Sequence, residues 1–195
     1  MAQEDRERWN AKYRAGSHAS EVASSALVEL AAWVPAQGRG LDVAGGMGRN
    51  ALWLARRGLD MTVVDISEVA LARVVERAGQ ARLDLKVAAM DLEVDPLPSG
   101  PFSLVLCCDY LQRSLVSAVA EVLAVGGRLL WIHPLEANLE RHPKPGRRHL
   151  LSPGEARGLV ESAGLRVVVA EEGWVGEGAA ARCLARVVGE RVDGG

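Results

Sequence analysis

The sequence predicts an α/β protein, a Rossmann-like three-layer α/β/α sandwich whose seven-stranded, mostly parallel sheet ends in an antiparallel C-terminal hairpin strand. Short β-branched runs alternate with longer amphipathic stretches, which is typical of a parallel sheet covered by helices. Near the C-terminus, two β-rich runs are joined by the short segment 176–178, and this spacing favours an antiparallel hairpin. The 195 residues, 49% of them hydrophobic, suffice for one core, so we expect a single domain over residues 1–195.

The same patterns place the individual elements. Strands are expected near 40–44, 61–65, 84–89, 102–108, 127–133, 165–171 and 181–188. Helices are expected between them at about 48–57, 67–79, 114–124 and 152–163. Ser152 would cap the last of these, with Pro153 at its first position and Glu155 at its third. Two more helices, about 4–14 and 20–33, would make residues 1–37 an N-terminal helical cap, and residues 134–151 form the one long irregular stretch.

A glycine-rich turn follows the first expected strand, in the run LDVAGGMG at residues 41–48. Glycines at Gly46 and Gly48 let the backbone approach a ligand, and the N–H groups of the following helix face whatever lies above the strand end. The run from Gly46 to Ala51 also fits the dinucleotide pattern GxGxxG/A, with Asp65 at a suitable distance to bind a ribose. Asp42 favours a different nucleoside, because its carboxylate would repel a pyrophosphate and attract a cationic sulfonium or ammonium group.

Several segments resemble the class I S-adenosylmethionine-dependent methyltransferases. LDVAGGMGRNALWLARRG followed by MTVVDIS is similar to their motif I and acidic loop, and RWNAKYRAG to the N-terminal helix that caps the cofactor. Asp91-Leu92 is similar to the segment that contacts adenine, and VGGRLLWI to the turn and strand after the fourth helix. The resemblance covers essentially the whole chain and is nearest to the small-molecule branch related to tellurite-resistance methyltransferases. It implies an enzyme that uses S-adenosylmethionine, leaves S-adenosylhomocysteine and methylates a small molecule.

The resemblance also implies roles for residues. Asp42 would hold the ammonium group of the methionine moiety, and Asp65 would accept both ribose hydroxyls. Asp91 would accept from the adenine amine. Ala44 replaces the first glycine of the usual motif, and we expect it to adopt a φ that an L-residue accepts. The implied cofactor-binding set is Asp42, Ala44, Gly45, Gly46, Gly48, Asn50, Asp65, Ile66, Asp91, Leu92, Cys107, Trp9, Tyr13 and Arg14.

The acceptor site is expected above the strand ends, beside the segment 134–151, which would be a substrate-side loop. This loop is basic, most of all over residues 139–149, and with Arg113 could receive an anionic or oxyanionic acceptor; alternatively, it is a solvated surface loop. His133, Tyr110 and Arg113 are candidates for a catalytic or acceptor-orienting role. No general base is assigned, because the sulfonium itself activates the leaving group.

Composition bears on partners and location. A formal net charge of −2 argues against nucleic acid as a partner, and no apolar run of about 18 residues predicts a membrane span. We therefore expect a cytoplasmic protein. The cysteines, Cys107, Cys108 and Cys183, lack the spacing of a zinc site, and no metal is expected. The oligomeric state stays open, as do two alternatives: a non-catalytic S-adenosylmethionine- or nucleotide-binding protein, and an NAD-dependent oxidoreductase.

Overall fold

A seven-stranded sheet forms the centre of the computed structural model, which describes residues 2–16 and 20–193. The strand order is β3-β2-β1-β4-β5-β7-β6, and only β7 runs antiparallel to its neighbours. The strands are β1 (Gly38–Val43), β2 (Leu59–Asp65), β3 (Lys86–Ala89), β4 (Phe102–Cys108), β5 (Leu123–Pro134), β6 (Arg166–Val175) and β7 (Arg182–Glu190). The predicted fold class, including the antiparallel strand near the C-terminus, is confirmed.

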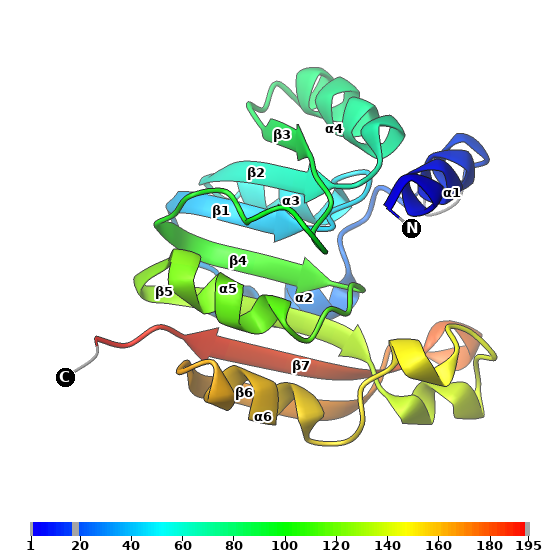
Figure 1. The fold of residues 1–195 in the computed structure, drawn as a ribbon, viewed down its shortest axis with the longest axis vertical. Helices are drawn as coiled ribbons and strands as arrows, with labels where there is room; N and C mark the ends of the chain where they lie inside the picture. The colour runs from blue at the N-terminus through cyan, green and yellow to red at the C-terminus, as the bar shows by residue number, and fades with distance from the viewer. Residues whose placement is uncertain (1, 17–19, 194–195) are drawn as a thin grey trace.

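Helices cover both faces of the sheet. They are α1 (Ala2–Arg14), α2 (Ser25–Glu29), α3 (Arg49–Ala55), α4 (Glu68–Ala81), α5 (Leu115–Val122) and α6 (Glu155–Ser162). In Figure 1, α5 and α6 lie in front of the sheet, and α2 and α3 lie behind it. The period-two alternation of β5 divides its side chains between the two cores, with Leu129 and Trp131 in one and Leu130 and Ile132 in the other.

The strand order reverses direction between β1 and β4, where the chain crosses to the other half of the sheet. Open α/β sheets bind ligands outside the carboxyl ends of the strands at such a switch point. The glycine-rich turn after β1 and the residues after β4 flank this point. Figure 1 shows α1 and the segment that follows β5 at this end of the sheet, and the C-terminus at the opposite end.

Several element boundaries differ from the sequence prediction. The helix expected over 20–33 is wrong in most of its length: α2 spans Ser25–Glu29 and a separate 3-10 turn spans Ala31–Trp33. The helix expected over 152–163 begins only at Glu155, because Gly154 adopts a φ of +75° and caps it in place of Ser152. The strand expected over 127–133 extends over Leu123–Pro134, since α5 ends at Val122 and the chain continues directly into β5.

The segment after β5 is anchored more firmly than an irregular loop would be. It contains 3-10 turns over Glu136–Glu140 and Arg147–His149, and Leu135 forms a β-bridge with Leu151. Asn138 is buried, and its side-chain carbonyl accepts a hydrogen bond from the Cys183 N–H at 3.1 Å. The segment is therefore fastened to the start of β7.

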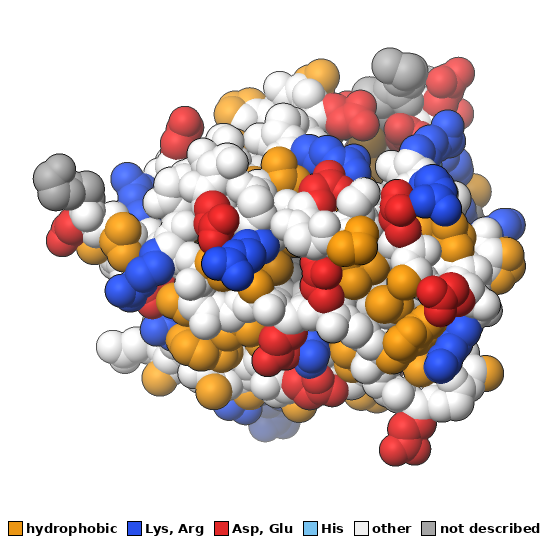
Figure 2. Space-filling model, turned by 90° about the horizontal axis from the view of Figure 1, so that it is seen from below, with side chains coloured by type: hydrophobic (Ala, Val, Ile, Leu, Met, Phe, Trp, Pro, Cys, Tyr) orange, Lys and Arg blue, Asp and Glu red, His pale blue; other side chains and the backbone are white. Residues whose placement is uncertain are grey.

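In the described part of the chain, no helix combines the length and apolar character that crossing a bilayer requires. Figure 2 shows the molecule from the side of β6 and α6, where the side chains of Lys and Arg are interspersed with those of Asp and Glu.

Candidate functional site

The turn after β1 has the backbone geometry of a close-approach loop. Gly46 and Gly48 have φ values of +55° and +74°, and a Cβ on Gly46 would lie 2.7 Å from the Tyr13 hydroxyl. The expectation for Ala44 is wrong: its φ is +53°, in the left-handed region that costs an L-residue about 1 kcal/mol. Ala44 therefore holds the conformation of the glycine that it replaces, at the cost of local strain.

Two acids lie at the ends of adjacent strands beside this turn. Asp65 is fixed by backbone donors: the Gly46 N–H reaches its Oδ2 at 2.8 Å and the Ser67 N–H its Oδ1 at 2.9 Å. Asp42 is 1% exposed, and its Oδ2 meets no donor among the described residues. Burial and the nearby Asp65 carboxylate raise the pKa of Asp42 to about 7, and burial raises the pKa of Asp65 as well. The pair is a buried acidic site suited to a cation.

A third acid lies after β3. Asp91 is buried, and while its Oδ1 accepts from the Glu93 N–H at 3.0 Å, its Oδ2 has no donor within the described residues. The backbone carbonyl of the neighbouring Leu92 accepts from the Gln112 side chain at 2.9 Å. Ile66, directly after Asp65, is half-buried at the start of the connection to α4. The ends of β1, β2 and β3 thus carry Asp42, Asp65 and Asp91 in spatial order along the sheet.

Helix α1 lies against the start of α4. The Asn10 side-chain carbonyl accepts from the Ser67 hydroxyl at 2.6 Å, and the same hydroxyl caps α4 by accepting from the Ala70 N–H at 3.2 Å. Tyr13 lies close enough to the acids that burial and the charges of Asp65 and Asp42 raise the pKa of its hydroxyl. Helix α1 therefore covers the glycine turn, with Tyr13 over Gly46.

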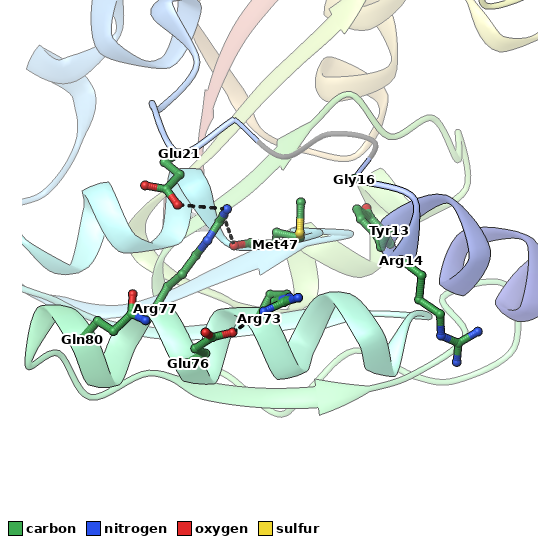
Figure 3. A pocket seen from close by; sticks show the side chains of 9 residues that line it. All are labelled: Tyr13, Arg14, Gly16, Glu21, Met47, Arg73, Glu76, Arg77 and Gln80. Atoms are coloured by element: carbon green, nitrogen blue, oxygen red, sulfur yellow. Dashed lines mark hydrogen bonds and ion pairs between the residues drawn. The ribbon is translucent and has the colours of Figure 1, made fainter.

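The aromatic rings of α1 stack on one another. The Trp9 and Tyr13 ring centroids are 5.7 Å apart, and the Lys12 ammonium lies 4.3 Å above the Trp9 ring. Tyr13 and the next residue, Arg14, also line a cavity of about 320 Å³ between the end of α1, the glycine turn and α4 (Figure 3). The other lining residues are Gly16, Glu21, Met47, Arg73, Glu76, Arg77 and Gln80.

Four of the five charged side chains that line this cavity pair with one another. Arg77 donates to the Met47 carbonyl at 3.1 Å and pairs with Glu21 at 3.4 Å, as Figure 3 shows. Arg73 pairs with Glu76 at 2.6 Å. Of the sequence-predicted residues, only Tyr13 and Arg14 line it, and Tyr13 forms its border with the acidic site.

Two further predicted residues serve the framework of the site. Asn50 is buried in α3, and its side-chain carbonyl accepts from the Ser24 N–H at 2.9 Å, which joins α3 to the residue before α2. Cys107 is buried in β4 and pairs in register with Val43 of β1. The Cys107 thiol donates to the carbonyl of Tyr110 at 3.4 Å, and the Tyr110 hydroxyl donates to Gln112 at 2.7 Å.

His133 lies at the end of β5 and is 4% exposed. Its Nε2 lies 2.9 Å from the His149 carbonyl, which only accepts, so Nε2 carries the proton and the neutral ring leaves Nδ1 as an acceptor. Nδ1 is buried with no partner in the described part of the chain, and burial lowers the pKa of His133. His133 therefore fastens the segment after β5 with one nitrogen and presents a lone pair with the other.

The basic residues expected to receive an acceptor are largely engaged within the protein. Arg113 pairs with Glu155 and donates to the Leu150 carbonyl at 3.3 Å. Within the loop, Arg147 pairs with Glu136 at 2.6 Å. Arg141 lies over the Trp174 ring at 4.0 Å, and His142 contacts the Ala181 carbonyl at 2.6 Å.

A charged cluster that the sequence did not predict lies at the switch point. Asp109, directly after β4, has a φ of +64° and accepts from both terminal nitrogens of Arg182 at 3.1 and 2.8 Å. Arg49, the first residue of α3, approaches the same carboxylate at 3.5 Å. Asp42 and Asp65 are acids at the ends of expected strands, and Asp109, which directly follows the expected strand 102–108, carries nearly the same signal. The arginines carry no such signal.

Residues 41–127 match the family model described as a methyltransferase domain. A hemagglutinin 1 from Eikenella corrodens is 28% identical over 141 residues, which are 72% of this chain and 42% of that protein. A ubiquinone biosynthesis O-methyltransferase from Alkalilimnicola ehrlichii is 32% identical over 112 residues, which are 53% of this chain and 42% of that protein. The chain thus spans about two fifths of the length of both curated relatives.

Solved structures share the fold. TehB from Haemophilus influenzae superimposes with a TM-score of 0.74 at 17% identity, over 92% of this chain and 66% of that chain. An S-adenosylmethionine-dependent methyltransferase from Mesorhizobium loti superimposes with a TM-score of 0.71 at 18% identity, over 86% of this chain and 98% of that chain. At such identities the likeness concerns the arrangement of strands and helices.

Proposed function

We propose that this chain, which carries a class I methyltransferase domain, binds S-adenosylmethionine over the turn after β1 and transfers its methyl group to a small, anionic acceptor. One observation carries the cofactor assignment: Asp42 is buried beside Asp65 with an oxygen that meets no donor in the described structure. A buried acidic pair without a cation is unfavourable, and a ligand with an ammonium and a sulfonium group would compensate its charge.

The residues present fit the remaining parts of this cofactor. Asp65, held in place by Gly46 and Ser67, retains lone pairs for the two ribose hydroxyls. The unpartnered Oδ2 of Asp91 can accept from the adenine amine, and Ile66 offers an apolar surface for the ring. Tyr13 would cover the methionine end from α1. The proposed cofactor therefore extends from β1 to β3 along the carboxyl ends of the strands.

The bound cofactor would supply a methyl group on a cationic sulfur, a leaving group that needs no protonation. The protein then has to align the acceptor and exclude water. The stacked Trp9 and Tyr13 of α1 would shield one side of the site, and the segment fastened by His133 the other. Figure 1 shows α1 and this segment at the same end of the sheet, beyond the carboxyl ends of the parallel strands.

Calorimetry tests the proposal directly. We expect S-adenosylmethionine and S-adenosylhomocysteine to bind and NAD not to bind, because Asp42 would repel the pyrophosphate. Asp65→Ala should weaken both interactions by about 1–3 kcal/mol, the usual value of hydrogen bonds to a charged group. Asp60→Ala is the matched control, since Asp60 is an exposed acid at the other end of β2 that pairs with Lys86. Binding of NAD alone would refute the proposal.

A further inference from the structure

Arg49 and Arg182, here called the arginine pair, flank Asp109 in a charged cluster. The cluster joins three elements at the carboxyl edge of the sheet. Asp109 follows β4, Arg49 begins α3 and Arg182 begins β7. Because β7 is antiparallel to β5, its first residues lie beside the end of β5, with Leu184 opposite Pro134. The cluster thus lies at the switch point, next to the glycine turn.

The arginine pair carries a surplus positive charge. Two guanidinium groups, which stay charged at all relevant pH values, share the single carboxylate of Asp109. Asp109 is the only acid that pairs with either arginine among the residues that the structure describes. Each guanidinium has five donors, and the long 3.5 Å contact of Arg49 leaves most of its donors uncommitted.

The cluster is accessible and geometrically constrained. The side chains of Arg49, Asp109 and Arg182 are 32%, 34% and 37% exposed, so a ligand can reach them. Asp109 holds a left-handed backbone conformation, and its N–H donates to the Ile132 carbonyl at 2.9 Å. This conformation places its carboxylate between the two guanidinium groups, and such strained positions concentrate at functional sites.

A second observation points to the same place. The buried Nδ1 of His133 has no partner in the described part of the chain, and the charges of Asp109, Arg182 and Arg113 all act on the His133 ring. The paired Arg113 and Arg147, by contrast, each face their own acid, Glu155 and Glu136. Two arginines also share one acid where Arg128 and Arg166 pair with Glu190. That group lies near the start of β5 and at the end of β7, at the edge of the sheet opposite the glycine turn.

We propose that Arg49 and Arg182, with Asp109 between them, bind the anionic group of the methyl acceptor, most simply a carboxylate. This inference rests on the proposed function, which assigns the ends of β1, β2 and β3 to the cofactor. The ends of β4 and β5 and the start of β7 then remain for the acceptor, and Arg182 is on that side of the sheet. A planar carboxylate suits the fork of donors that each guanidinium presents. The anion site thus lies at the arginine pair, and not on the loop 139–149.

Chloride serves as the probe, because the line width of its NMR signal reports exchange with anion sites. In the complex with S-adenosylhomocysteine, we expect Arg49→Gln and Arg182→Gln each to reduce the excess line width about two-fold or more, because each removes a cation from the site. Asp109→Asn should increase it, since the site gains net positive charge. Asparagine tolerates the left-handed conformation, so this variant preserves the backbone.

Arg147→Gln is the matched control: it removes an arginine from the basic loop and should leave the line width unchanged. The affinity for S-adenosylhomocysteine, measured by calorimetry, should change less than about two-fold in all four variants. A tenfold or so loss in Arg49→Gln and Arg182→Gln would assign the pair to the cofactor carboxylate and overturn the proposal. An unchanged chloride signal in these two variants would also overturn it.

Failure of the proposed function has a different signature. If the wild-type protein does not bind S-adenosylhomocysteine, the cofactor assignment fails. The chloride measurement on the free protein would then still show whether Arg49 and Arg182 form an anion site.

Discussion

The carboxyl group of Asp42 is almost fully buried, and one of its oxygens meets no donor in the described structure. Because its pKa is raised to about 7, its ionisation costs the free protein stability at pH 8. Asp42→Asn keeps the side-chain shape but removes the charge. We expect the free energy of unfolding at pH 8 to rise by up to roughly 4 kcal/mol and S-adenosylmethionine binding to weaken. Denaturant titration and calorimetry measure the two effects.

The opposite signs of these effects make the prediction specific. Asp60→Asn provides the control, because Asp60 is an exposed acid on the adjacent strand β2, and its replacement should change neither quantity by more than a few tenths of a kcal/mol. Tighter cofactor binding in Asp42→Asn would contradict the charge compensation that supports the proposed function.

Strain at Ala44 gives a second prediction at the residue scale. Glycine adopts the φ of +53° without steric cost, so Ala44→Gly should raise the free energy of unfolding by about 0.5–1 kcal/mol, less the packing that the methyl group contributes. Gly48→Ala is the reverse change and should destabilise the protein. The φ of Gly48 is +74°, and an added Cβ would lie 2.9 Å from the Val74 side chain. Thermal unfolding of both variants is the measurement. Destabilisation by Ala44→Gly would mean that packing outweighs strain at this turn.

At the scale of elements, the attachment of α1 depends on Asn10. Its carbonyl is the acceptor for the Ser67 hydroxyl that caps α4, so Asn10→Ala should release α1 while leaving the sheet intact. If the free energy of local opening of α1 falls by about 1 kcal/mol, amide exchange in α1 becomes roughly five-fold faster. Hydrogen exchange followed by mass spectrometry measures this rate.

Arg8→Ala is a suitable comparison, because Arg8 is exposed and pairs with Asp5 within α1. It should alter the exchange of α1 much less. Equal exchange in wild type and Asn10→Ala would show that the stacked rings of Trp9 and Tyr13, and not Asn10, hold the helix.

The elements that the sequence predicted well are those with strong periodicity. β4 was predicted at Phe102–Cys108, where the structure places it, since its apolar run is bounded by turn residues. The helix over 20–33 failed because the buried Asn50 holds the Ser24 N–H, and α2 begins only after this contact. Local pattern carries no information about such a partner 26 residues away.

At the scale of the whole molecule, the acidic site was predictable and the arginine pair was not. Asp42 and Asp65 lie at the carboxyl ends of the consecutive parallel strands β1 and β2, and parallel strands bring these ends to one edge. Arg182 reaches Asp109 only because β7 inserts between β5 and β6, with 73 residues between the two in sequence. A hairpin pattern predicts that β6 and β7 pair, but not which of them adjoins β5.

Asp42 and His133 give the whole molecule a characteristic dependence of stability on pH. The pKa of Asp42 is higher in the folded than in the unfolded state, so the folded state binds more protons and stability falls as the pH rises from about 4 to about 7. The pKa of His133 is lowered on folding, so the unfolded state binds more protons and stability falls as the pH drops below about 6.5. The two contributions oppose one another between these limits.

Replacing Asp42 and replacing His133 should therefore change the slope of the free energy of unfolding against pH in opposite directions. In Asp42→Asn, the free energy of unfolding should rise more steeply with pH between about 4 and 7 than in wild type, because the Asp42 contribution, roughly 4 kcal/mol at full extent, is gone. In His133→Gln the free energy of unfolding should rise less with pH, or fall. The rise that His133 contributes is gone, while the acids with raised pKa still lower stability as the pH rises. Urea denaturation at a series of pH values gives both curves. Parallel curves for wild type and both variants would show that neither group changes its protonation between the unfolded and the folded state.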